Sequence, residues 1–105
     1  MPEPAPNKRY ALLVVDGNEP GKVLPIEKTR VVLGRKGCDI VFDDPEISRR
    51  QAAIVIEGPD VFLEDLGSTN GTYIEGLRID KANLQNGSLF RMGTHQLKLV
   101  VSEES

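Results

Sequence analysis

The sequence contains few of the residues on which several classes of protein depend. It has one cysteine, one histidine and no tryptophan among 105 residues. A single cysteine excludes a disulfide within the chain and agrees with a reducing compartment, so we expect a cytoplasmic protein. Two tyrosines and three phenylalanines are few for a surface on which nucleic-acid bases stack. No apolar run approaches the ~20 residues of a membrane-spanning helix, and the N-terminus lacks a signal-peptide core, so we expect no membrane partner.

The charge balance also argues against a nucleic-acid partner. Thirteen basic and 16 acidic residues give a formal net charge of −3, whereas non-specific binding to nucleic acid requires a basic surface. Hydrophobic residues make up 39% of the chain and charged residues 28%, which is ordinary for a soluble globular protein. The length is sufficient for one domain with its own core.

The chain offers no recognisable catalytic or metal-binding set. Asp43, Asp44 and Glu46 do not follow the spacing of cation ligands, and we interpret them as an ordinary acidic turn. His95 stands without a cluster of other metal-ligating residues, so we expect it to be a bystander. We expect Cys38 to be an inert thiol. We therefore predict no metal, no cofactor and no enzymatic activity.

The hydrophobic pattern predicts an all-β domain. Short runs of β-branched and alternating residues recur between turn residues, and no helical period is present. The expected strands cover residues 8–15, 22–26, 29–33, 40–42, 51–57, 61–66, 72–74, 88–92 and 95–101, while residues 77–85 are less regular. Pro25 places the second strand at an edge or a bulge, and Asn86-Gly87 is typical of a hairpin turn. This pattern is typical of a β-sandwich or barrel.

The two ends of the chain are expected to lie outside the folded domain. Residues 1–7 hold three prolines at alternate positions and predict a disordered, proline-rich lead-in. Residues 8–101 are the expected domain, and residues 102–105 are expected to fray as a short tail.

Three loops carry the polar side chains from which a binding site could be built. They contain Arg35 and Lys36, then Ser48, Arg49 and Arg50, and finally Ser68, Thr69 and Asn70. Arginine matches phosphate oxygens, hydroxyl groups can donate to the same oxygens, and asparagine suits a peptide backbone. Loops of a sandwich can converge at one end, where this set would bind a phosphopeptide. Solvated surface charges and a polar hairpin turn at 67–71 would explain the same residues separately.

The order of these loops resembles a known family. Leu33-Gly34-Arg35, residues 47–50 (Ile-Ser-Arg-Arg) and residues 66–74 resemble the three motif blocks of forkhead-associated (FHA) domains, and residues 84–93 resemble a late block of that family. The resemblance covers about residues 8–101. It implies an eleven-stranded, antiparallel-type β-sandwich whose loops at one end bind phosphothreonine peptides of proteins phosphorylated by a Ser/Thr kinase.

The resemblance also implies a role for each loop residue. Arg35 matches the arginine that pairs with the phosphate, and Ser48 matches the serine whose hydroxyl contacts it. Arg49 matches a residue that helps to hold the phosphate or the peptide backbone. Thr69 matches the hydroxyl residue that supports the phosphate loop, and Asn70 matches the asparagine that bonds the peptide main chain.

Further residues of the same blocks are expected to shape or surround the site. Gly34, Gly67 and Gly71 match loop glycines, while Lys36, Arg50 and Ser68 are candidate rim residues. The family usually has histidine three residues after the serine, where this chain has Gln51. Because glutamine can still donate and accept hydrogen bonds, we expect Gln51 to brace the loops with modestly weaker ligand binding.

Three functions compete at the level of the sequence, and the third, a hydrolase or phosphatase, is disfavoured because no Ser-His-Asp or Cys-His set is visible. The first is a non-enzymatic bacterial signalling module, monomeric as an isolated domain, that docks onto a phosphothreonine-containing protein. The second is a phosphate-independent scaffold for protein–protein contact on the same fold, which the departure at Gln51 favours.

Overall fold

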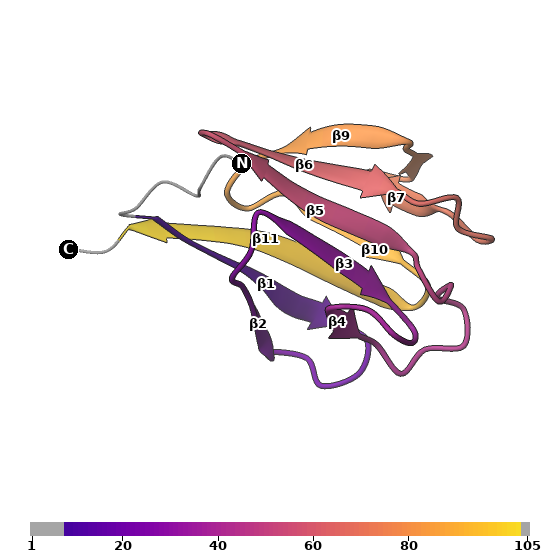
Figure 1. Ribbon diagram of the computed structural model, residues 1–105. Coiled ribbons are helices and arrows are strands. Elements are labelled where there is room, and N and C mark those ends of the chain that lie inside the picture. The colour runs from indigo at the N-terminus through magenta and orange to yellow at the C-terminus, as the bar shows by residue number, and fades with distance from the viewer. Residues whose placement is uncertain (1–7, 104–105) are drawn as a thin grey trace.

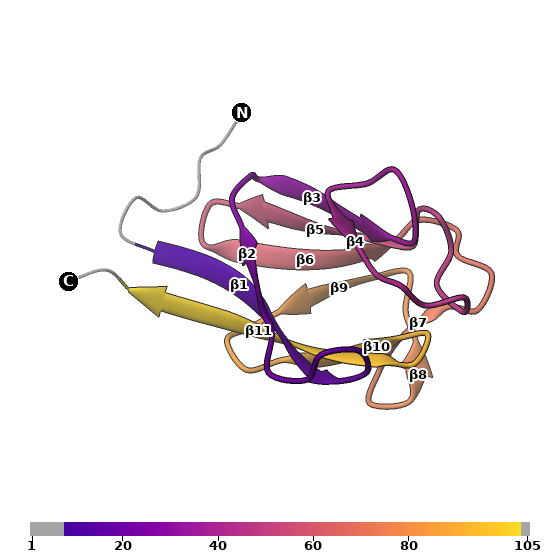
Figure 2. The same ribbon diagram turned by 90° about the horizontal axis from the view of Figure 1, so that it is seen from below.

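Two β-sheets pack face to face in the described part of the chain, residues 8–103 of the computed structural model (Figure 1, Figure 2). The strands are β1 (Lys8–Asp16), β2 (Val23–Ile26), β3 (Arg30–Gly34), β4 (Ile40–Val41), β5 (Ala52–Glu57), β6 (Asp60–Asp65), β7 (Thr72–Ile74), β8 (Leu77–Arg78), β9 (Lys81–Leu84), β10 (Leu89–Met92) and β11 (His95–Glu103). One sheet has the order β2-β1-β11-β10-β7-β8, and the other has the order β4-β3-β5-β6-β9. The predicted all-β sandwich of eleven strands is therefore confirmed.

Neighbouring strands pair in antiparallel fashion within residues 8–103, with the exception of the parallel pair β3–β4. Strand β2 lies at the edge of the six-stranded sheet, and its Pro25 stands opposite Ala11 of β1. Proline has no N–H to donate to a second neighbour, so the edge position predicted from Pro25 is confirmed.

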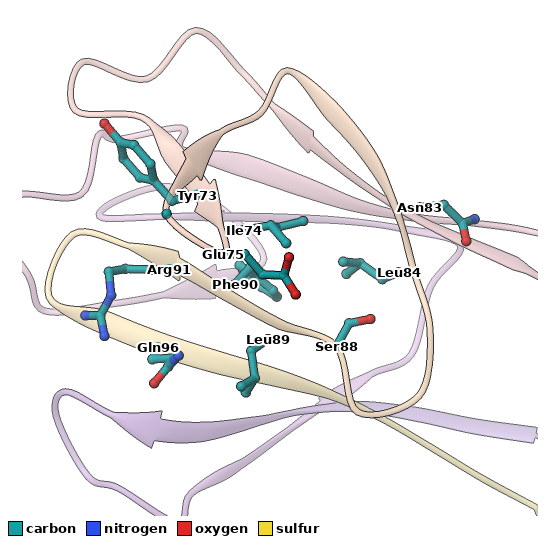
Figure 3. Close-up of a pocket in the computed structure, with 11 residues that line it drawn as sticks. Tyr73, Ile74, Glu75, Asn83, Leu84, Ser88, Leu89, Phe90, Arg91 and Gln96 are labelled. Atoms are coloured by element: carbon teal, nitrogen blue, oxygen red, sulfur yellow. The ribbon is translucent and has the colours of Figure 1, made fainter.

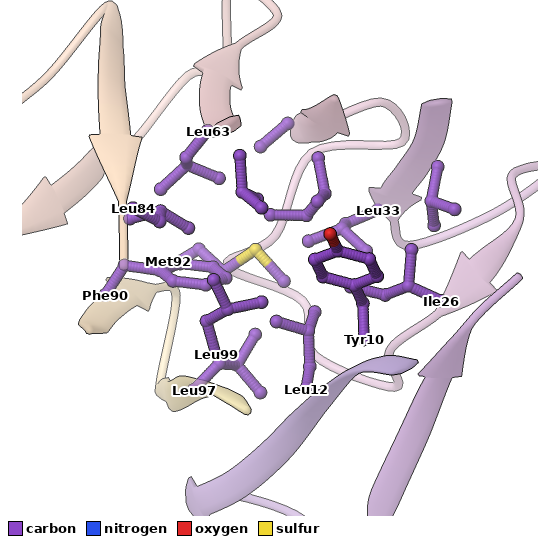
Figure 4. Packing of buried hydrophobic residues seen from close by; sticks show 14 of the residues in the cluster. Tyr10, Leu12, Ile26, Leu33, Leu63, Leu84, Phe90, Met92, Leu97 and Leu99 are labelled. Atoms are coloured by element: carbon purple, nitrogen blue, oxygen red, sulfur yellow. The ribbon is translucent and has the colours of Figure 1, made fainter. Parts of the chain in front are cut away.

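Strand alternation builds the core between the two sheets. In β1, Tyr10, Leu12 and Val14 are buried and alternate with less buried residues. In β11, Leu97 and Leu99 are fully buried in the same way. Figure 4 shows the side chains of Tyr10, Leu12, Leu97 and Leu99 meeting residues of the opposite sheet, such as Leu33 of β3 and Leu63 of β6. Burial of each such side chain stabilises the fold by about 1.5–3 kcal/mol.

The nine expected strands are present with ends shifted by at most two residues, but the region from 77 to 85 is more regular than the pattern predicted. Glu75 and Gly76 have positive φ angles of 51° and 78° and form the two-residue turn that closes the β7–β8 hairpin. Strand β9 then pairs with β6 in the other sheet. Because β8 has two residues, its pairing depends on tertiary packing and leaves little pattern in the sequence.

Two turn predictions differ from the structure. Asn86-Gly87 does not form a hairpin, because β9 and β10 belong to different sheets. The Ser88 N–H donates to the Gln85 carbonyl oxygen at 2.9 Å, which closes an ordinary turn between the sheets. The loop 67–71 is likewise no hairpin, because it leads from β6 in one sheet to β7 in the other.

The C-terminal strand also extends beyond the expected domain end. Arg9 pairs with Ser102 and Lys8 pairs with Glu103, so β11 continues two residues past the point where fraying was expected. The expected lead-in at 1–7 and residues 104–105 lie outside the described residues.

The fold brings three loops to one end of the sandwich. Strands β3 and β6 end there, and β5 begins there (Figure 1). The Gln51 N–H donates to the Leu33 carbonyl oxygen at 2.9 Å, and the Leu66 N–H donates to the Gln51 carbonyl oxygen at 3.0 Å. These bonds align the three strand ends, so the loops that leave them lie side by side.

Candidate functional site

The three loops form one open depression of about 300 Å³ at this end of the sandwich. All five residues predicted to contact a ligand line it, namely Arg35, Ser48, Arg49, Thr69 and Asn70. Pro45, Glu46 and Ile47 complete its walls. Both arginine side chains are exposed. Residues separated by up to 35 positions in the sequence therefore meet in a single site, as convergence of the loops predicted.

Ser48 is the residue at which the three loops join. Its carbonyl oxygen accepts a hydrogen bond of 3.0 Å from the Arg35 N–H. Its hydroxyl oxygen accepts a hydrogen bond of 3.0 Å from the Thr69 N–H. Because the hydroxyl oxygen accepts from Thr69 through one of its lone pairs, its own hydrogen is available to donate toward the depression.

Asn70 links the third loop to the second. Its Nδ2 atom donates to the Glu46 carbonyl oxygen at 3.0 Å. The Asn70 side chain is exposed at the depression. Its amide therefore lies at the surface of the depression and carries both donor hydrogens and an acceptor oxygen.

Two glycines of the motif blocks are required by local geometry, Gly34 by a backbone contact and Gly71 by its positive φ. A Cβ atom on Gly34 would lie 1.9 Å from the Arg49 carbonyl oxygen, so any side chain there would separate the first two loops. Gly71 has a φ of 90°, and a Cβ atom on it would lie 2.9 Å from Nε of Arg78. The loop-geometry role predicted for these glycines agrees with the contacts.

Gln51 braces the loops from inside the protein, where its side chain has no exposed surface. Its Oε1 atom accepts from the Ser48 N–H at 2.9 Å. Its Nε2 atom donates to the Gly71 carbonyl oxygen at 2.9 Å and contacts Thr72 Oγ1 at 3.1 Å. One buried amide thus joins the second loop to the third, as the bracing role predicted.

Ser68 does not lie on the rim, because its side chain is buried with 4% of its surface exposed. Its hydroxyl donates to Asp65 Oδ1 at 2.6 Å and accepts from the Gly71 N–H at 3.0 Å. The rim prediction was wrong for Ser68, since the hydroxyl serves the internal structure of the loop. Lys36 and Arg50 are exposed but do not line the depression, so their rim role stays a prediction.

The sequence did not single out Asp65, which holds the third loop at its start. Its carboxylate accepts from the N–H groups of Gly67 and Ser68, each at 3.0 Å, and from Thr72 Oγ1 at 2.7 Å. Burial raises the pKa of Asp65, but these hydrogen bonds and that from the Ser68 hydroxyl outweigh it, so the pKa lies below its ordinary value. An aspartate two residues before a glycine is typical of such a turn and was the available signal.

Asp44 and His95 form a buried hydrogen-bonded pair that the sequence did not predict. His95 Nδ1 donates to Asp44 Oδ2 at 2.9 Å, and the side chains of both residues are 2% or less exposed. His95 Nε2 accepts from the Asn18 N–H at 3.2 Å, which places the ring hydrogen on Nδ1. Both residues therefore have a structural role that the sequence pattern did not reveal. Asp44 still belongs to a turn, in which its carbonyl oxygen accepts from the Ile47 N–H at 3.1 Å.

Asp44 connects the second loop to the β10–β11 turn. Its carboxylate also accepts from the Thr94 N–H at 2.8 Å, the Thr94 hydroxyl at 2.7 Å and the Glu46 N–H at 2.9 Å. Burial raises the pKa of Asp44, but these bonds outweigh burial and lower it to about 2. Asp44 directly precedes Pro45 and binds the Glu46 N–H, and both Pro45 and Glu46 line the depression, so the pair supports its wall.

Cys38 lies in the first loop but does not line the depression. Burial and the neighbouring Asp39 raise the pKa of the Cys38 thiol, so little of it is the reactive thiolate at neutral pH. No three His, Cys, Asp or Glu side chains within residues 8–103 are grouped so as to hold a metal ion. In the same residues, no helix is long and apolar enough to cross a membrane.

A larger hollow of about 550 Å³ lies away from the three loops (Figure 3). Its lining is mainly apolar and includes Tyr73, Ile74, Leu89 and Phe90, with Arg91 near one end (Figure 3). None of the predicted ligand residues lines it. The loop-end depression is therefore the place where the motif residues gather.

Comparison with known proteins points to one family. A family model described as the FHA domain matches residues 31–93. The glycogen accumulation regulator GarA of Mycolicibacterium smegmatis is 32% identical over 104 residues, which cover 98% of this chain and 66% of GarA. GarA of Mycobacterium tuberculosis is 36% identical over 89 residues, or 83% of this chain and 55% of that protein. The chain thus spans about half to two thirds of the length of these relatives.

Solved structures agree with that comparison. The FHA domain of the CT664 protein from Chlamydia trachomatis has a TM-score of 0.80 and 33% identity, covering 88% of this chain and 96% of that domain. EmbR of Mycobacterium tuberculosis, solved in complex with a low-affinity phosphopeptide, has a TM-score of 0.81 and 28% identity over 92% of this chain and 25% of EmbR.

Proposed function

Because this chain belongs to the forkhead-associated (FHA) domain family, we propose that it is a signalling module that binds phosphothreonine peptides. Its partner would be a protein phosphorylated on threonine by a Ser/Thr kinase. The observation that carries the proposal is the meeting of Arg35, Ser48, Arg49, Thr69 and Asn70 in one depression.

In this arrangement, some residues would contact the phosphate group and others the main chain of the peptide. Arg35 and Arg49 are exposed guanidinium groups and would pair with the phosphate, which carries about −1.5 to −2 charges at neutral pH. The Ser48 hydroxyl would donate its hydrogen to a phosphate oxygen. Asn70 would bond the main chain of the peptide, and Thr69 would support the loop between them.

Local charge supports an anionic ligand. The chain has a net charge of −3, yet two arginines and a single carboxylate, that of Glu46, line the depression. Positive groups concentrated at one end of the molecule attract a phosphate group, although the molecule as a whole is acidic.

The relatives support the same ligand class. EmbR has been solved with a phosphopeptide, and an FHA domain 26% identical to this chain was solved in work on phosphothreonine-dependent interactions. Those properties belong to the relatives. For this chain we propose the same class of ligand, a role without catalysis, and action in a bacterial cytoplasm as a monomeric domain.

A peptide titration tests the proposal. Several charge-assisted hydrogen bonds, offset by the ordering of the peptide, correspond to micromolar affinity, or about −8 kcal/mol. We expect a degenerate phosphothreonine library to bind, and phosphoserine and unphosphorylated libraries to bind more weakly. Arg35→Ala should weaken binding by about 2 kcal/mol or more. Arg30→Ala removes an equal charge from the opposite end of β3 and serves as the matched control.

The alternative is a scaffold that ignores phosphate. Its motivation was the glutamine at position 51, and the contacts of Gln51 with the second and third loops weaken that motivation. Equal binding of phosphorylated and unphosphorylated libraries, unaffected by Arg35→Ala, would refute the phosphothreonine proposal and favour the scaffold.

A further inference from the structure

We propose that Arg78 is a positioning residue for the phosphopeptide site, acting on the Ser48 hydroxyl through the peptide group between Ser68 and Thr69. This inference rests on the proposed function and adds a residue outside the three loops. Arg78 belongs to the two-residue strand β8. It does not line the depression, so any effect on the ligand must pass through the protein.

The Arg78 side chain lies over the third loop. Its Nη2 atom donates to the Ser68 carbonyl oxygen at 3.1 Å. A Cβ atom on Gly71 would lie 2.9 Å from Nε and 3.1 Å from Cδ of Arg78, so the side chain covers the glycine backbone. The same added Cβ would meet the Tyr73 ring at 3.0 Å. Arg78 is exposed but is held in place by the loop it covers.

One peptide group connects this contact to the site. The carbonyl group of Ser68 and the N–H of Thr69 belong to the same planar unit and point in opposite directions when it is trans. No cis peptide bond occurs within residues 8–103. Arg78 holds the carbonyl end at 3.1 Å, and Ser48 Oγ accepts from the N–H end at 3.0 Å. Fixing the first end therefore fixes the direction of the second.

The consequence falls on the Ser48 hydroxyl. While Oγ accepts from the Thr69 N–H, its own hydrogen is available for a phosphate oxygen. A positive donor on the carbonyl also polarises the peptide group and strengthens its N–H as a donor. Without Arg78 the peptide group could turn about its flanking bonds, and the hydroxyl would lose the partner that orients it.

Asp65 fixes the same loop at a different group. Its carboxylate accepts from the Gly67 and Ser68 N–H groups, on the N-terminal side of the Ser68 side chain. Within residues 8–103, the peptide group that follows Ser68 accepts a hydrogen bond from Arg78 at its carbonyl oxygen and donates one to Ser48 through its N–H. Arg78 is thus the residue whose removal should disturb that group while the rest of the loop stays anchored.

The test compares two replacements of Arg78 in two backgrounds. Arg78→Met keeps the apolar stem over Gly71 without a donor, and Arg78→Lys keeps a positive donor. We expect Arg78→Met to weaken binding of a phosphothreonine peptide about tenfold, and Arg78→Lys to recover about half of that loss on a logarithmic scale. In the Ser48→Ala background, where the hydroxyl is absent, Arg78→Met should change affinity by less than about twofold.

Arg91 supplies the matched control. Arg78 and Arg91 stand opposite the same residue, Tyr73, on the two strands that flank β7. Both arginines are exposed, and Arg91→Met removes the same charge without touching the Ser68 carbonyl. We expect it to leave affinity within about twofold of wild type. An equal loss with Arg91→Met, or an equal effect of Arg78→Met in both backgrounds, would overturn the proposal.

A measurement without ligand separates this inference from the proposed function. In NMR spectra of the free protein, Arg78→Met should shift the backbone amide resonance of Thr69, and Arg91→Met should not. If wild type binds no phosphothreonine peptide, the proposed function fails, and the Thr69 resonance still decides whether Arg78 positions the peptide group. An unmoved Thr69 resonance in Arg78→Met would refute the inference.

Discussion

The Oε1 atom of Gln51 accepts a hydrogen bond of 2.9 Å from the backbone N–H of Ser48, from a position with no exposed surface. The same amide reaches Gly71 and Thr72 on the third loop through Nε2. A residue whose identity departs from the family pattern therefore makes the contacts between loops on which the site depends. Glutamine can do this because one end of its amide accepts while the other donates.

Replacement of Gln51 by alanine should damage both stability and binding. It would remove the Gln51 partner of the half-buried Ser48 N–H and of the buried Gly71 carbonyl oxygen, and would open a cavity. We expect the free energy of unfolding, measured by urea denaturation, to fall by about 2–4 kcal/mol. Peptide affinity should fall as well. Gln85→Ala, at an exposed turn position, is the control, and an equal effect of both substitutions would contradict the bracing role.

Gly34→Ala should be more harmful than its small size suggests. The added methyl would lie 1.9 Å from the Arg49 carbonyl oxygen, an overlap that requires the first two loops to move apart. We expect a loss of about 3 kcal/mol or more in unfolding free energy. Gly37→Ala is the comparison, because it has a φ of 67° and open space around it. Backbone strain alone should cost about 1–2 kcal/mol there, and an equal loss at both positions would exclude overlap as the cause.

Alanine substitution of the two adjacent hydroxyl residues in the third loop should affect different properties, stability at Ser68 and peptide binding at Thr69. Ser68→Ala removes a buried hydroxyl bonded to Asp65 and Gly71, and should lower the unfolding free energy by about 1–3 kcal/mol. Thr69 is exposed, so Thr69→Ala should change stability by no more than about 0.5 kcal/mol while weakening peptide binding. Thermal unfolding and peptide titration of both variants check this contrast. A larger stability loss in Thr69→Ala than in Ser68→Ala would refute the assignment.

Much of the fold could be predicted because it depends on local pattern. Alternation in residues 8–15 and 95–101 identifies strands whose apolar side chains face the core, and the expected strand at 72–74 matches β7. Turn residues mark where strands end but not which sheet the next strand joins. Gly67–Gly71 and Asn86-Gly87 were therefore compatible with hairpins, although both segments cross between the sheets. That choice is made by tertiary packing.

Part of the candidate site could also be predicted from the sequence, and part of it could not. Residues of the motif blocks converge as predicted, because loops at one end of a sandwich meet even when they are distant in sequence. The burial of Ser68 beside the exposed Thr69 could not be predicted, since an irregular loop has no period that tells inside from outside. Asp44 and His95 are 51 positions apart and share no pattern, so only the folded chain makes them partners.

The Asp44–His95 pair should give stability a defined dependence on pH. The pKa of Asp44 falls from an ordinary 3.8 to about 2 in the folded protein, so its carboxylate contributes about 2 kcal/mol that is fully present above the unfolded pKa. That contribution is lost as the pH falls from about 4 toward 2. We expect urea denaturation to show Asp44→Asn less stable than wild type at pH 7, with the difference shrinking below pH 4. Asp43→Asn removes a neighbouring exposed charge as the control. A difference between wild type and Asp44→Asn that stays constant over this range would contradict a contribution from the charge of the carboxylate.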